Sequence, residues 1–533
     1  MGVTTLSADV AVIGGGLGGV AAALAVARTS RRVVLTDEFE WLGGQLTSQA
    51  VPPDEHAWVE QFGVTSSYRR LRDGIRDYYR RNYPLTARAH GDVRLNPGDG
   101  TVSKLCAEPR VAAAVLHEML APFIANGLIT VLRGVKPVAT EGARDRVDRV
   151  VLAGRDGAEY VVAARYVIDA TETGELLPLA EVDYAVGSES RHEHGEPSAP
   201  ETADPTNVQA ITWCFAFDHD TTPHLIDRPA TYDYWHEYEV PFWGDRLLSF
   251  TAPNPRTLQP ERRTMDVNPP LADVTADQSV AAGDGDLWVF RRILARRNLQ
   301  PGFLGSDIVL ANWPMLDYLD SSIIDVPDPA RHLEAARQLS LSYFYWLQTE
   351  APRPDGGFGW PGLRLRGDVV GTRDGLAQAP YIRESRRIKA LRTVAEQDVS
   401  VAVRGSGKPA TFSDSVGVGM YRIDLHPTTG GDNYLDVECA PFEIPLGALV
   451  PRRHENLLPG GKNIGTTHIT NGAYRLHPVE WNIGEASGAL AVYALDHDVT
   501  PQQVATDSSH VLRLQDRLAA QGVEIHWPDI VGY

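Results

Sequence analysis

The chain has 533 residues, of which 43% are hydrophobic and 22% charged, and its formal net charge at pH 7 is −19. This length exceeds what one compact core usually serves, so we expect two or more domains, and the negative charge disfavours nucleic acid and anionic membranes as partners. No apolar run reaches the length of a membrane span, and three scattered cysteines without C-x-x-C spacing argue against a redox disulfide or a zinc site and fit a cytoplasmic location.

A strand, a glycine turn and a helix open the chain. The short apolar run Ala8–Ile13 predicts a buried parallel strand. Gly14, Gly16 and Gly19 follow with the spacing G-x-G-x-x-G, and the Ala-, Val- and Leu-rich run Leu17–Arg28 predicts a buried helix. Such glycines allow a tight turn and a close approach of the backbone to a pyrophosphate, which the helix N-terminus also favours. The pattern therefore predicts a dinucleotide site.

The next elements extend this site. Val33–Thr36 predicts a second strand, and Asp37 stands at its end, where a carboxylate accepts hydrogen bonds from a ribose. A glycine pair follows within Leu42–Gln45 and suits a second loop lying against a bulky cofactor. A simple tight turn is the alternative.

The following hundred residues predict helices and then strands. Residues 54–104 indicate one or two exposed helices followed by a loop, and Pro109–Ala125 has a helical pattern. Three short strands are expected at Leu128–Val138, Arg146–Ala153 and Glu159–Ala163. A further strand beginning at Ala164 ends in Asp-Ala-Thr at residues 169–171, which places small side chains beside the cofactor.

The middle of the chain has a different character, beginning at about Asp183. Gly187–Asn207 is a polar loop, in which two histidines have metal-like spacing but no clear third ligand, so we expect no metal site. Trp213–Phe217 predicts an antiparallel strand, and helices are expected at Ala330–Leu347 and within Ala379–Gln397. The aromatic and proline-rich composition of this region favours an α+β insertion that builds a substrate pocket.

The C-terminal part again has a cofactor-binding pattern. Asn456–Gly465 predicts a strand that runs into a glycine turn, followed by a loop through His468 to Arg475. Trp481–Leu495 predicts a helix rich in small residues, with Pro478 in its first turn.

Several motifs resemble those of one flavoprotein family. They are Leu42–Gln45 (LGGQ), Asn312–Tyr318 (NWPMLDY), Tyr381–Arg387 (YIRESRR) and Gly461–Ile464 (GKNI), with further matches at Asp414–Gly417, Asp424–Pro427, His468 and Arg475. The chain resembles the FAD-dependent oxidoreductase family of the glutathione-reductase fold type. This resemblance implies a tightly bound FAD and a redox reaction, and it leaves the substrate open. The chain has no second glycine fingerprint in a strand–helix setting and no C-x-x-x-x-C, so we expect neither a separate NADPH domain nor a disulfide reductase.

The expected fold class is α/β, with a Rossmann-like FAD-binding domain that contains a parallel sheet and a three-stranded β-meander, plus an inserted α+β substrate domain. The expected boundaries are 1–182 and 411–505 for the two parts of the FAD-binding domain, 183–410 for the substrate or cap domain, and 506–533 for a C-terminal extension. The expected FAD-binding residues are Gly14, Gly16, Gly18, Gly19, Asp37, Glu38, Gly43, Gly44, Gln45, Asp169, Ala170, Thr171, Gly461, Asn463, Pro478, Glu480 and Gly484.

The chemistry is expected near the C-terminal helix. The fold type implies that the helix after Pro478 points its N-terminus at the flavin, where a helix dipole stabilises negative charge on the reduced ring. Hydride transfer from an alcohol or amine benefits from a base, so His468 and His477 are candidate bases and Arg475 is a candidate electrostatic or substrate-anchoring group. A capping role for His477 and a structural role for His468 are the alternatives.

Other polar residues are candidates for substrate binding. They are Asn312, Trp313, Asp317, Tyr318 and His426, each of which has a structural role in a corner or turn as its alternative. Arg383, Glu384, Arg386 and Arg387 have i,i+3 spacings that favour a structural role on a helix face. His56 lies within sequence reach of the flavin, but spacing alone does not support covalent attachment.

The first hypothesis is an FAD-dependent oxidase or dehydrogenase that transfers hydride from a C–OH group of a small polar substrate to flavin N5. Sugars, polyols and natural-product intermediates are the expected substrate classes. Dehydrogenation of an amine, an amino acid or a C–C bond is the alternative reaction, and a flavin-binding protein without turnover is a third hypothesis. The expected partners are the small-molecule substrate and either oxygen or another electron acceptor, and a homo-oligomer is left open.

Overall fold

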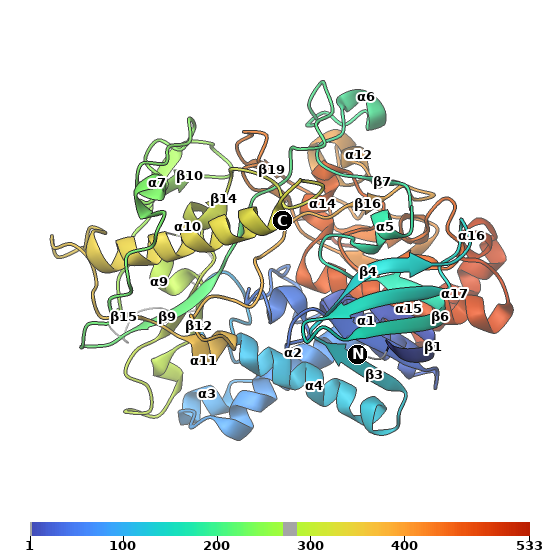
Figure 1. Ribbon diagram of the computed structural model, residues 1–533, viewed down its shortest axis with the longest axis horizontal. Coiled ribbons are helices and arrows are strands. Elements are labelled where there is room, and N and C mark those ends of the chain that lie inside the picture. Colours follow the sequence, from blue (N-terminus) through green and yellow to red (C-terminus); the bar gives the residue numbers. More distant parts are fainter. Residues whose placement is uncertain (1–2, 270–284, 533) are drawn as a thin grey trace.

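The computed structural model describes residues 3–269 and 285–532. Figure 1 shows the N-terminal and C-terminal parts of the chain together on one side and the middle of the chain, with its long helix α10, on the other. No helix among the described residues is both long enough and apolar enough to cross a membrane.

A parallel sheet forms the centre of the first part. Its strands are β1 (Val3–Ile13), β2 (Val33–Asp37), β3 (Ile129–Arg133), β6 (Glu159–Asp169) and β21 (Leu457–Pro459), in the spatial order β3-β2-β1-β6-β21. The last strand comes from the far end of the chain, so the sheet is completed only when the two ends of the sequence meet. This is the Rossmann-like α/β arrangement that the glycine fingerprint predicts.

The β-meander differs from the expected one in how its strands are divided. The region expected to form one strand, Leu128–Val138, forms β3 and then β4 (Val135–Glu141), which pairs with β5 (Arg149–Gly154). The two strands expected over residues 159–169 are instead the single strand β6. The first half of β6 pairs with β5 in the antiparallel meander, and its second half pairs with β21. On its other edge β6 pairs with β1 along its whole length, which keeps the two halves in one strand.

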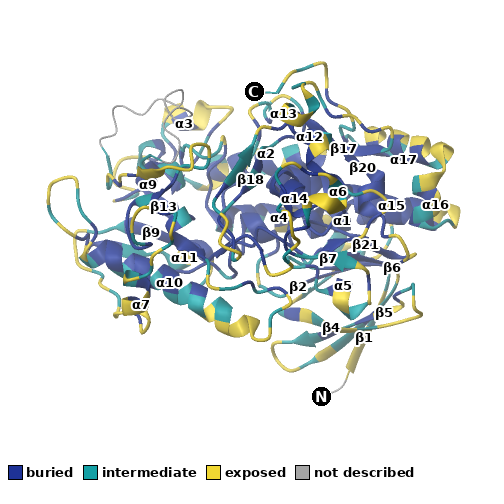
Figure 2. Cartoon of the chain, turned by 90° about the horizontal axis from the view of Figure 1, so that it is seen from above, coloured by how far each residue is buried: buried dark blue, intermediate teal, exposed yellow. Residues whose placement is uncertain are grey.

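Two buried helices pack against each other beside this sheet. They are α1 (Leu17–Ala27) and α15 (His477–His497), and Figure 2 shows both as buried over nearly their whole length. Their close approach depends on glycine: a Cβ at Gly484 would lie 1.9 Å from the carbonyl oxygen of Gly18. Helix α4 forms as expected over Pro109–Ala125. Helix α2 (Ser66–Asn82) is amphipathic rather than exposed all round, since it buries one face.

The middle of the chain builds a second, antiparallel sheet. Its order is β12 (Arg292–Leu294), β13 (Ile308–Ala311), β9 (Phe215–His219) and β15 (Leu363–Leu365), close to the antiparallel strand expected at Trp213–Phe217. Helix α10 (Pro329–Thr349) matches the helix expected at Ala330–Leu347. Aromatic rings of the sheet and helix pack edge to face and form the core between them.

The helix expected within Ala379–Gln397 is wrong. The segment is largely extended: the backbone of Tyr381 exchanges hydrogen bonds with Thr212, at 2.7 and 3.1 Å, and β16 (Arg387–Ile388) pairs with β7 (Tyr184–Ala185). Only α12 (Glu396–Val399) is helical. Residues 381–385 are all buried, and their charged side chains have partners on both sides of the segment. A surface helix buries only one face, so it would not allow this arrangement.

The loop expected from His468 to Arg475 is also wrong. Residues His468–Tyr474 form helix α14, whose N-terminus is capped because the Thr467 hydroxyl accepts a hydrogen bond from the backbone N–H of Thr470. Both residues are threonines in a short segment, so the capping pattern is easily taken for a loop signal.

The remaining described elements are α3 Ala87–Gly91, α5 Leu176–Leu179, α6 Arg191–His194, β8 Ile211–Thr212, α7 Tyr232–His236, β10 Thr251–Pro253, β11 Pro260–Arg262, α9 Leu287–Phe290, β14 Asp317–Tyr318, α11 Gly367–Val370, α13 Val401–Arg404, β17 Ser415–Gly419, β18 Ile423–Leu425, β19 Leu435–Val437, β20 Phe442–Pro445, α16 Pro501–Thr506, α17 Ser508–Ala520 and the 3₁₀ turns η1 Gly44–Leu46, η2 Arg296–Asn298, η3 Pro314–Leu316 and η4 Leu446–Leu449.

Candidate active site

The glycine turn lies between β1 and α1, where the end of β6 packs against it. Gly14 has a positive φ of 99°, and a Cβ there would lie 2.2 Å from the carbonyl oxygen of Ala170. A Cβ at Gly19 would lie 2.0 Å from the carbonyl oxygen of Gly14. At Gly16, in contrast, the nearest atoms to a Cβ are two carboxylate oxygens at 3.1 Å, from Glu172 and Glu480. A side chain at Gly16 would therefore be crowded by two side-chain ends, whereas at Gly14 and Gly19 it would collide with backbone.

Asp37 lies at the end of β2, beside this turn. Its carboxylate accepts a hydrogen bond of 2.6 Å from the backbone N–H of Phe39, and burial raises the pKa of Asp37 to about 8. A carboxylate in this position has further acceptor capacity for the hydroxyls of a ribose. The amide nitrogen of Gln49 is also buried without a hydrogen-bond partner among the described residues, which leaves one donor for a bound group.

Residues from the two ends of the chain meet at the N-terminus of α1. The carboxylate of Glu480, on α15, accepts hydrogen bonds from the backbone N–H of Gly18 at 3.3 Å and from the side-chain amide of Gln45. Burial raises the pKa of Glu480 to about 6. Lys462 is buried and forms an ion pair with the carboxylate of Glu172, so it supplies positive charge beside Glu172. The two ends of the chain therefore contact each other directly at this turn.

His477 is the first residue of α15, and both of its ring nitrogens are used by the backbone. Nδ1 accepts a hydrogen bond of 3.2 Å from the N–H of Asp54, and Nε2 lies 3.2 Å from the carbonyl oxygen of Val51, to which it donates. Burial lowers the pKa of His477 to about 3, so the ring is neutral. This arrangement ties the 51–54 segment to the helix and leaves no ring nitrogen open to a substrate.

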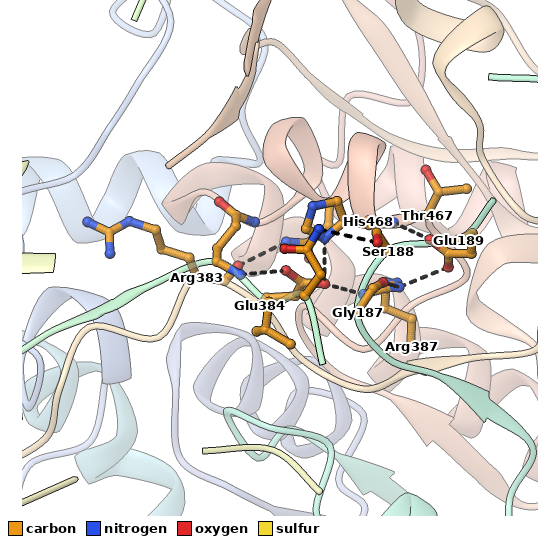
Figure 3. A network of polar contacts seen from close by, with 12 residues as sticks. Gly187, Ser188, Glu189, Arg383, Glu384, Arg387, Thr467 and His468 are labelled. Atoms are coloured by element: carbon orange, nitrogen blue, oxygen red, sulfur yellow. Dashed lines mark hydrogen bonds and ion pairs between the residues drawn. The ribbon is translucent and has the colours of Figure 1, made fainter. Parts of the chain in front are cut away.

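His468, at the start of α14, belongs to a buried ion-pair network (Figure 3). Its Nδ1 donates to Glu384 at 2.9 Å, and Glu384 and Glu189 in turn pair with Arg387 at 2.6 and 2.8 Å. Burial lowers the pKa of His468, but the Glu384 carboxylate outweighs burial and brings the pKa above its ordinary value. The raised pKa favours the charged form of His468, and that form cannot take a proton from a substrate.

Arg475 lies at the end of α14. Its guanidinium donates to the hydroxyl of Tyr381 at 3.0 Å and to the carboxylate of Asp424 at 3.1 Å, and its backbone carbonyl accepts from Gln45 at 2.8 Å. It therefore links the LGGQ loop to the middle of the chain.

Asp317 and His426 form a dyad, although 108 residues separate them in the sequence. His426 Nδ1 donates to Asp317 Oδ2 at 2.6 Å, while Thr212 and Arg383 contact Asp317 Oδ1 at 2.5 and 3.2 Å. Burial raises the pKa of Asp317, but the Arg383 and His426 charges outweigh it, so the pKa lies below its ordinary value and the carboxyl is ionised.

The other ring nitrogen of His426 is open. Burial and the nearby Arg383 charge lower the pKa of His426, so it is neutral near pH 7. Because Nδ1 carries the proton donated to Asp317, Nε2 has a free lone pair, and it makes no hydrogen bond with the part of the chain that the structure describes. The side chain is 18% exposed, and the Tyr434 ring lies beside it with 5.2 Å between ring centroids.

The remaining substrate candidates separate into two groups. The carbonyl oxygen of Asn312 accepts from Arg291 at 3.1 Å, while the side-chain oxygen of Asn312 and the indole nitrogen of Trp313 are buried without hydrogen-bond partners among residues 3–269 and 285–532. Tyr318 faces away from its neighbour Asp317, since its hydroxyl contacts the ring of His332 at 2.7 Å. The structure therefore brings Asp317 and His426 together and places Tyr318 elsewhere.

Sequence reasoning missed several charged residues near this centre. Asp54 has its pKa raised by burial and feels the charges of Arg291, Arg475, Asp424 and His426. Arg383 and Glu384 lie inside the YIRESRR motif, which could have marked them as functional residues. Their i,i+3 spacing instead favoured a structural role on a helix face. Asp54 and Arg291 belong to no motif that marks them.

A Rossmann-like sheet with a glycine turn at the start of the first helix is typical of dinucleotide-binding proteins. The family model described as FAD dependent oxidoreductase matches residues 9–518, so the chain belongs to this family and is an FAD-dependent oxidoreductase enzyme. Among curated protein sequences, none has significant similarity to the chain.

Similar solved structures share only part of the chain. They include a glycerol-3-phosphate dehydrogenase from Bacillus halodurans complexed with FAD (13% identity, 40% of each chain, TM-score 0.24) and the flavin-dependent monooxygenase PieE in complex with FAD and substrate (17% identity, 40% of this chain and 36% of that one, TM-score 0.24). An L-proline dehydrogenase from P. horikoshii matches at 15% identity over 36% of this chain and 25% of its own, with a TM-score of 0.18. The matched region spans less than half of each of these structures, and TM-scores this low support no further argument.

Proposed function

We propose that this enzyme oxidises a C–OH group of a small polar molecule, such as a sugar, a polyol or a natural-product intermediate. The observation that carries the proposal is the Asp317–His426 dyad, because oxidation of an alcohol to a carbonyl needs a base for the hydroxyl proton. His426 Nε2 is unprotonated, makes no hydrogen bond with a described residue, and belongs to a partly exposed side chain.

Each member of the dyad has a distinct role. His426 Nε2 takes the hydroxyl proton of the substrate as the C–O bond gains double-bond character. The Asp317 carboxylate holds the ring in the tautomer that leaves Nε2 free, and it stabilises the imidazolium that results. Arg383 and Thr212 keep Asp317 ionised and fixed in position. FAD, when bound, supplies the acceptor for the hydride that leaves the carbinol carbon.

The expected cofactor residues fit FAD. We propose that the Gly14–Gly19 turn and the α1 N-terminus hold the pyrophosphate and that Asp37 holds the ribose of the ADP half. Gln45, Lys462 and the N-terminus of α15 would then lie along the flavin half. The tight turn at Gly14 and Gly19, the buried carboxyl of Asp37 and the unpartnered amide of Gln49 support this assignment.

The three residues first considered for catalysis take other roles in this proposal. His477 fixes the 51–54 segment, His468 is a charged member of the Glu384 network, and Arg475 is an electrostatic or substrate-anchoring group beside Tyr381. We further propose that the middle of the chain, about residues 183–410, acts as the substrate domain, because Asp317 and Arg383 both come from it. The seven-stranded sheet, with its meander and its β21 strand, supports the glutathione-reductase type of FAD domain.

The proposal is tested by anaerobic mixing of the FAD-loaded protein with a panel of hydroxyl, amine and unsaturated compounds. We expect the flavin absorbance to bleach with a hydroxyl compound, and mass spectrometry to show a product lighter by two hydrogen atoms. Bleaching with amines or enoates alone would transfer the assignment to the alternative dehydrogenations. A protein that stays colourless after incubation with FAD would remove the cofactor assignment itself.

A further inference from the structure

A large cavity lies apart from the dyad and from the dinucleotide turn. Its volume is about 1290 Å³, and its walls come from residues 55–61, from α3 and the loop that follows it, and from residues 296–304. None of the residues assigned above to FAD or to the dyad lines it. One lining residue, Glu55, follows Asp54, whose backbone N–H donates to His477 at the start of α15.

Five cationic side chains line this cavity. They are Arg88, Arg94, Lys104, Arg296 and Arg297. Arg296 pairs with Asp307 at 3.6 Å, and Arg297 pairs with Asp99. The other three, Arg88, Arg94 and Lys104, form no ion pair with any residue that the structure describes.

The acidic residues of the lining do not balance these charges. They are Glu55, Glu60, Asp92 and Asp99. Glu55 pairs with Arg72 at 2.8 Å, and Glu60 pairs with Arg72 and Arg76 at 2.7 and 2.6 Å, so both are neutralised from behind the wall. The cavity therefore carries excess positive charge in a chain whose net charge is −19. A concave surface lined by one sign of charge concentrates ions of the other sign.

The cations stand on a fixed frame rather than on a loose loop. The side-chain amide of Asn298, only 4% exposed, donates to the carbonyl oxygens of Asn96 and Pro97 at 3.0 and 3.1 Å. The Asn96 amide donates to Ser103 at 3.1 Å, and Arg88 donates to Asn298 Oδ1 at 2.9 Å. Burial and the Arg88 charge both lower the pKa of Arg297, whose guanidinium pairs with Asp99.

We propose that this cavity binds a small organic polyanion, either phosphorylated or polycarboxylated. Among the described residues, Asp92 is the one carboxylate of the lining without an ion pair, so the three unpaired cations leave an excess of two positive charges, which a ligand with two negative charges would balance. Guanidinium groups match the paired oxygens of both phosphate and carboxylate groups. Arg94 and Lys104 are exposed and lie on the 92–104 loop, so they give ligand contacts without supporting the core.

The test is isothermal titration of the FAD-loaded protein at low ionic strength with inorganic pyrophosphate and, separately, with citrate. We expect saturable binding of one equivalent of at least one probe, weakened about tenfold by Arg94→Ala and by Lys104→Ala, since each removes a charge-assisted contact. The matched control is Arg144→Ala, which removes an exposed cation from the β4–β5 connection outside the cavity and should leave binding unchanged. Unchanged FAD content and melting temperature show that the variants are folded.

The outcomes separate the two ligand classes. Binding of pyrophosphate alone assigns a phosphorylated ligand, and binding of citrate alone assigns a polycarboxylate. Absence of binding by both probes would overturn the proposal, as would binding that Arg94→Ala and Lys104→Ala leave unchanged or that Arg144→Ala weakens equally. The titration does not depend on turnover, so its failure is distinguishable from failure of the proposed alcohol oxidation.

Discussion

The substitution His426→Gln tests the proposed base. Glutamine can still donate a hydrogen bond to Asp317, whose pairing with Arg383 is retained, so the fold and the FAD content should be unchanged. It cannot take a proton. General base catalysis contributes roughly 10²–10⁴-fold, which corresponds to about 3–5 kcal/mol of transition-state stabilisation, and we expect flavin reduction to slow by that factor.

The pH dependence gives a second signature. The pKa of His426 lies below its ordinary value of about 6.5, so the wild-type rate of flavin reduction should be unaffected by this group down to that pH and should fall only at lower pH, where the ring becomes protonated. His426→Gln should lose this limb. Both are measured by anaerobic stopped-flow absorbance. A variant that reduces its flavin within about threefold of the wild-type rate, with the acidic limb intact, would refute the role of His426.

The companion substitution Asp317→Asn separates catalysis from stability. It removes the counter-charge of Arg383, whose side chain is only 2% exposed, and breaking such a buried pair costs about 3–5 kcal/mol of the free energy of unfolding. We expect Asp317→Asn to lower both the rate of flavin reduction and the melting temperature, whereas His426→Gln should lower the rate alone. Equal melting temperatures for the two variants would contradict the assigned contacts.

Three further predictions address the cofactor half. The folded-state pKa of His477 is about 3, so below about pH 6.5 the unfolded chain binds a proton that the folded chain does not. The free energy of unfolding therefore decreases as the pH falls. Between pH 7 and pH 5, denaturant titrations should show His477→Gln losing about 2 kcal/mol less of this free energy than the wild type. Equal losses would show that His477 titrates normally. Gly484→Ala should lower the melting temperature through an overpacking cost of about 1–3 kcal/mol, because the new Cβ meets the Gly18 carbonyl oxygen. The control Gly91→Ala has nothing within 4 Å of the new Cβ and should leave the melting temperature unchanged. Equal melting temperatures for the two variants would contradict this prediction. Asp37→Asn should weaken FAD binding by about 10-fold or more in fluorescence titrations, since it replaces one of the two carboxyl oxygens that can accept from the ribose with an amide NH₂ group, and unchanged affinity would place the ribose elsewhere.

The parts of the fold that follow local patterns could be predicted from the sequence. The β1–α1–β2 unit, α4, α10 and α15 form close to their expected bounds, because hydrophobic periodicity and glycine or proline positions determine them locally. The segment within Ala379–Gln397 could not be predicted in this way. Its charged residues have the spacing of a helix face, but in the structure Arg387 pairs with Glu189 and Glu384 pairs with His468. These buried partners hold the segment extended, and both are distant from it in the sequence.

The site was predictable for the cofactor more than for the chemistry. Glycine spacing and the acidic residue after β2 mark a dinucleotide site within forty residues, and the family match supports FAD. The choice between histidines depends on which ring nitrogens the fold occupies. His477 has both nitrogens occupied by backbone groups, the Glu384 carboxylate raises the pKa of His468, and the pKa of His426 is lowered while its Nε2 makes no hydrogen bond with a described residue. Sequence position gives no sign of these differences.

The central claim is that the enzyme removes two hydrogen atoms from a carbinol with His426 as the base. It is tested most directly by anaerobic flavin reduction with a hydroxyl substrate and with the O-methyl ether of the same compound. The ether has the same carbon skeleton but no proton for His426 to take. We predict that the hydroxyl substrate bleaches the flavin and the ether does not. Equal rates with both compounds would contradict the account.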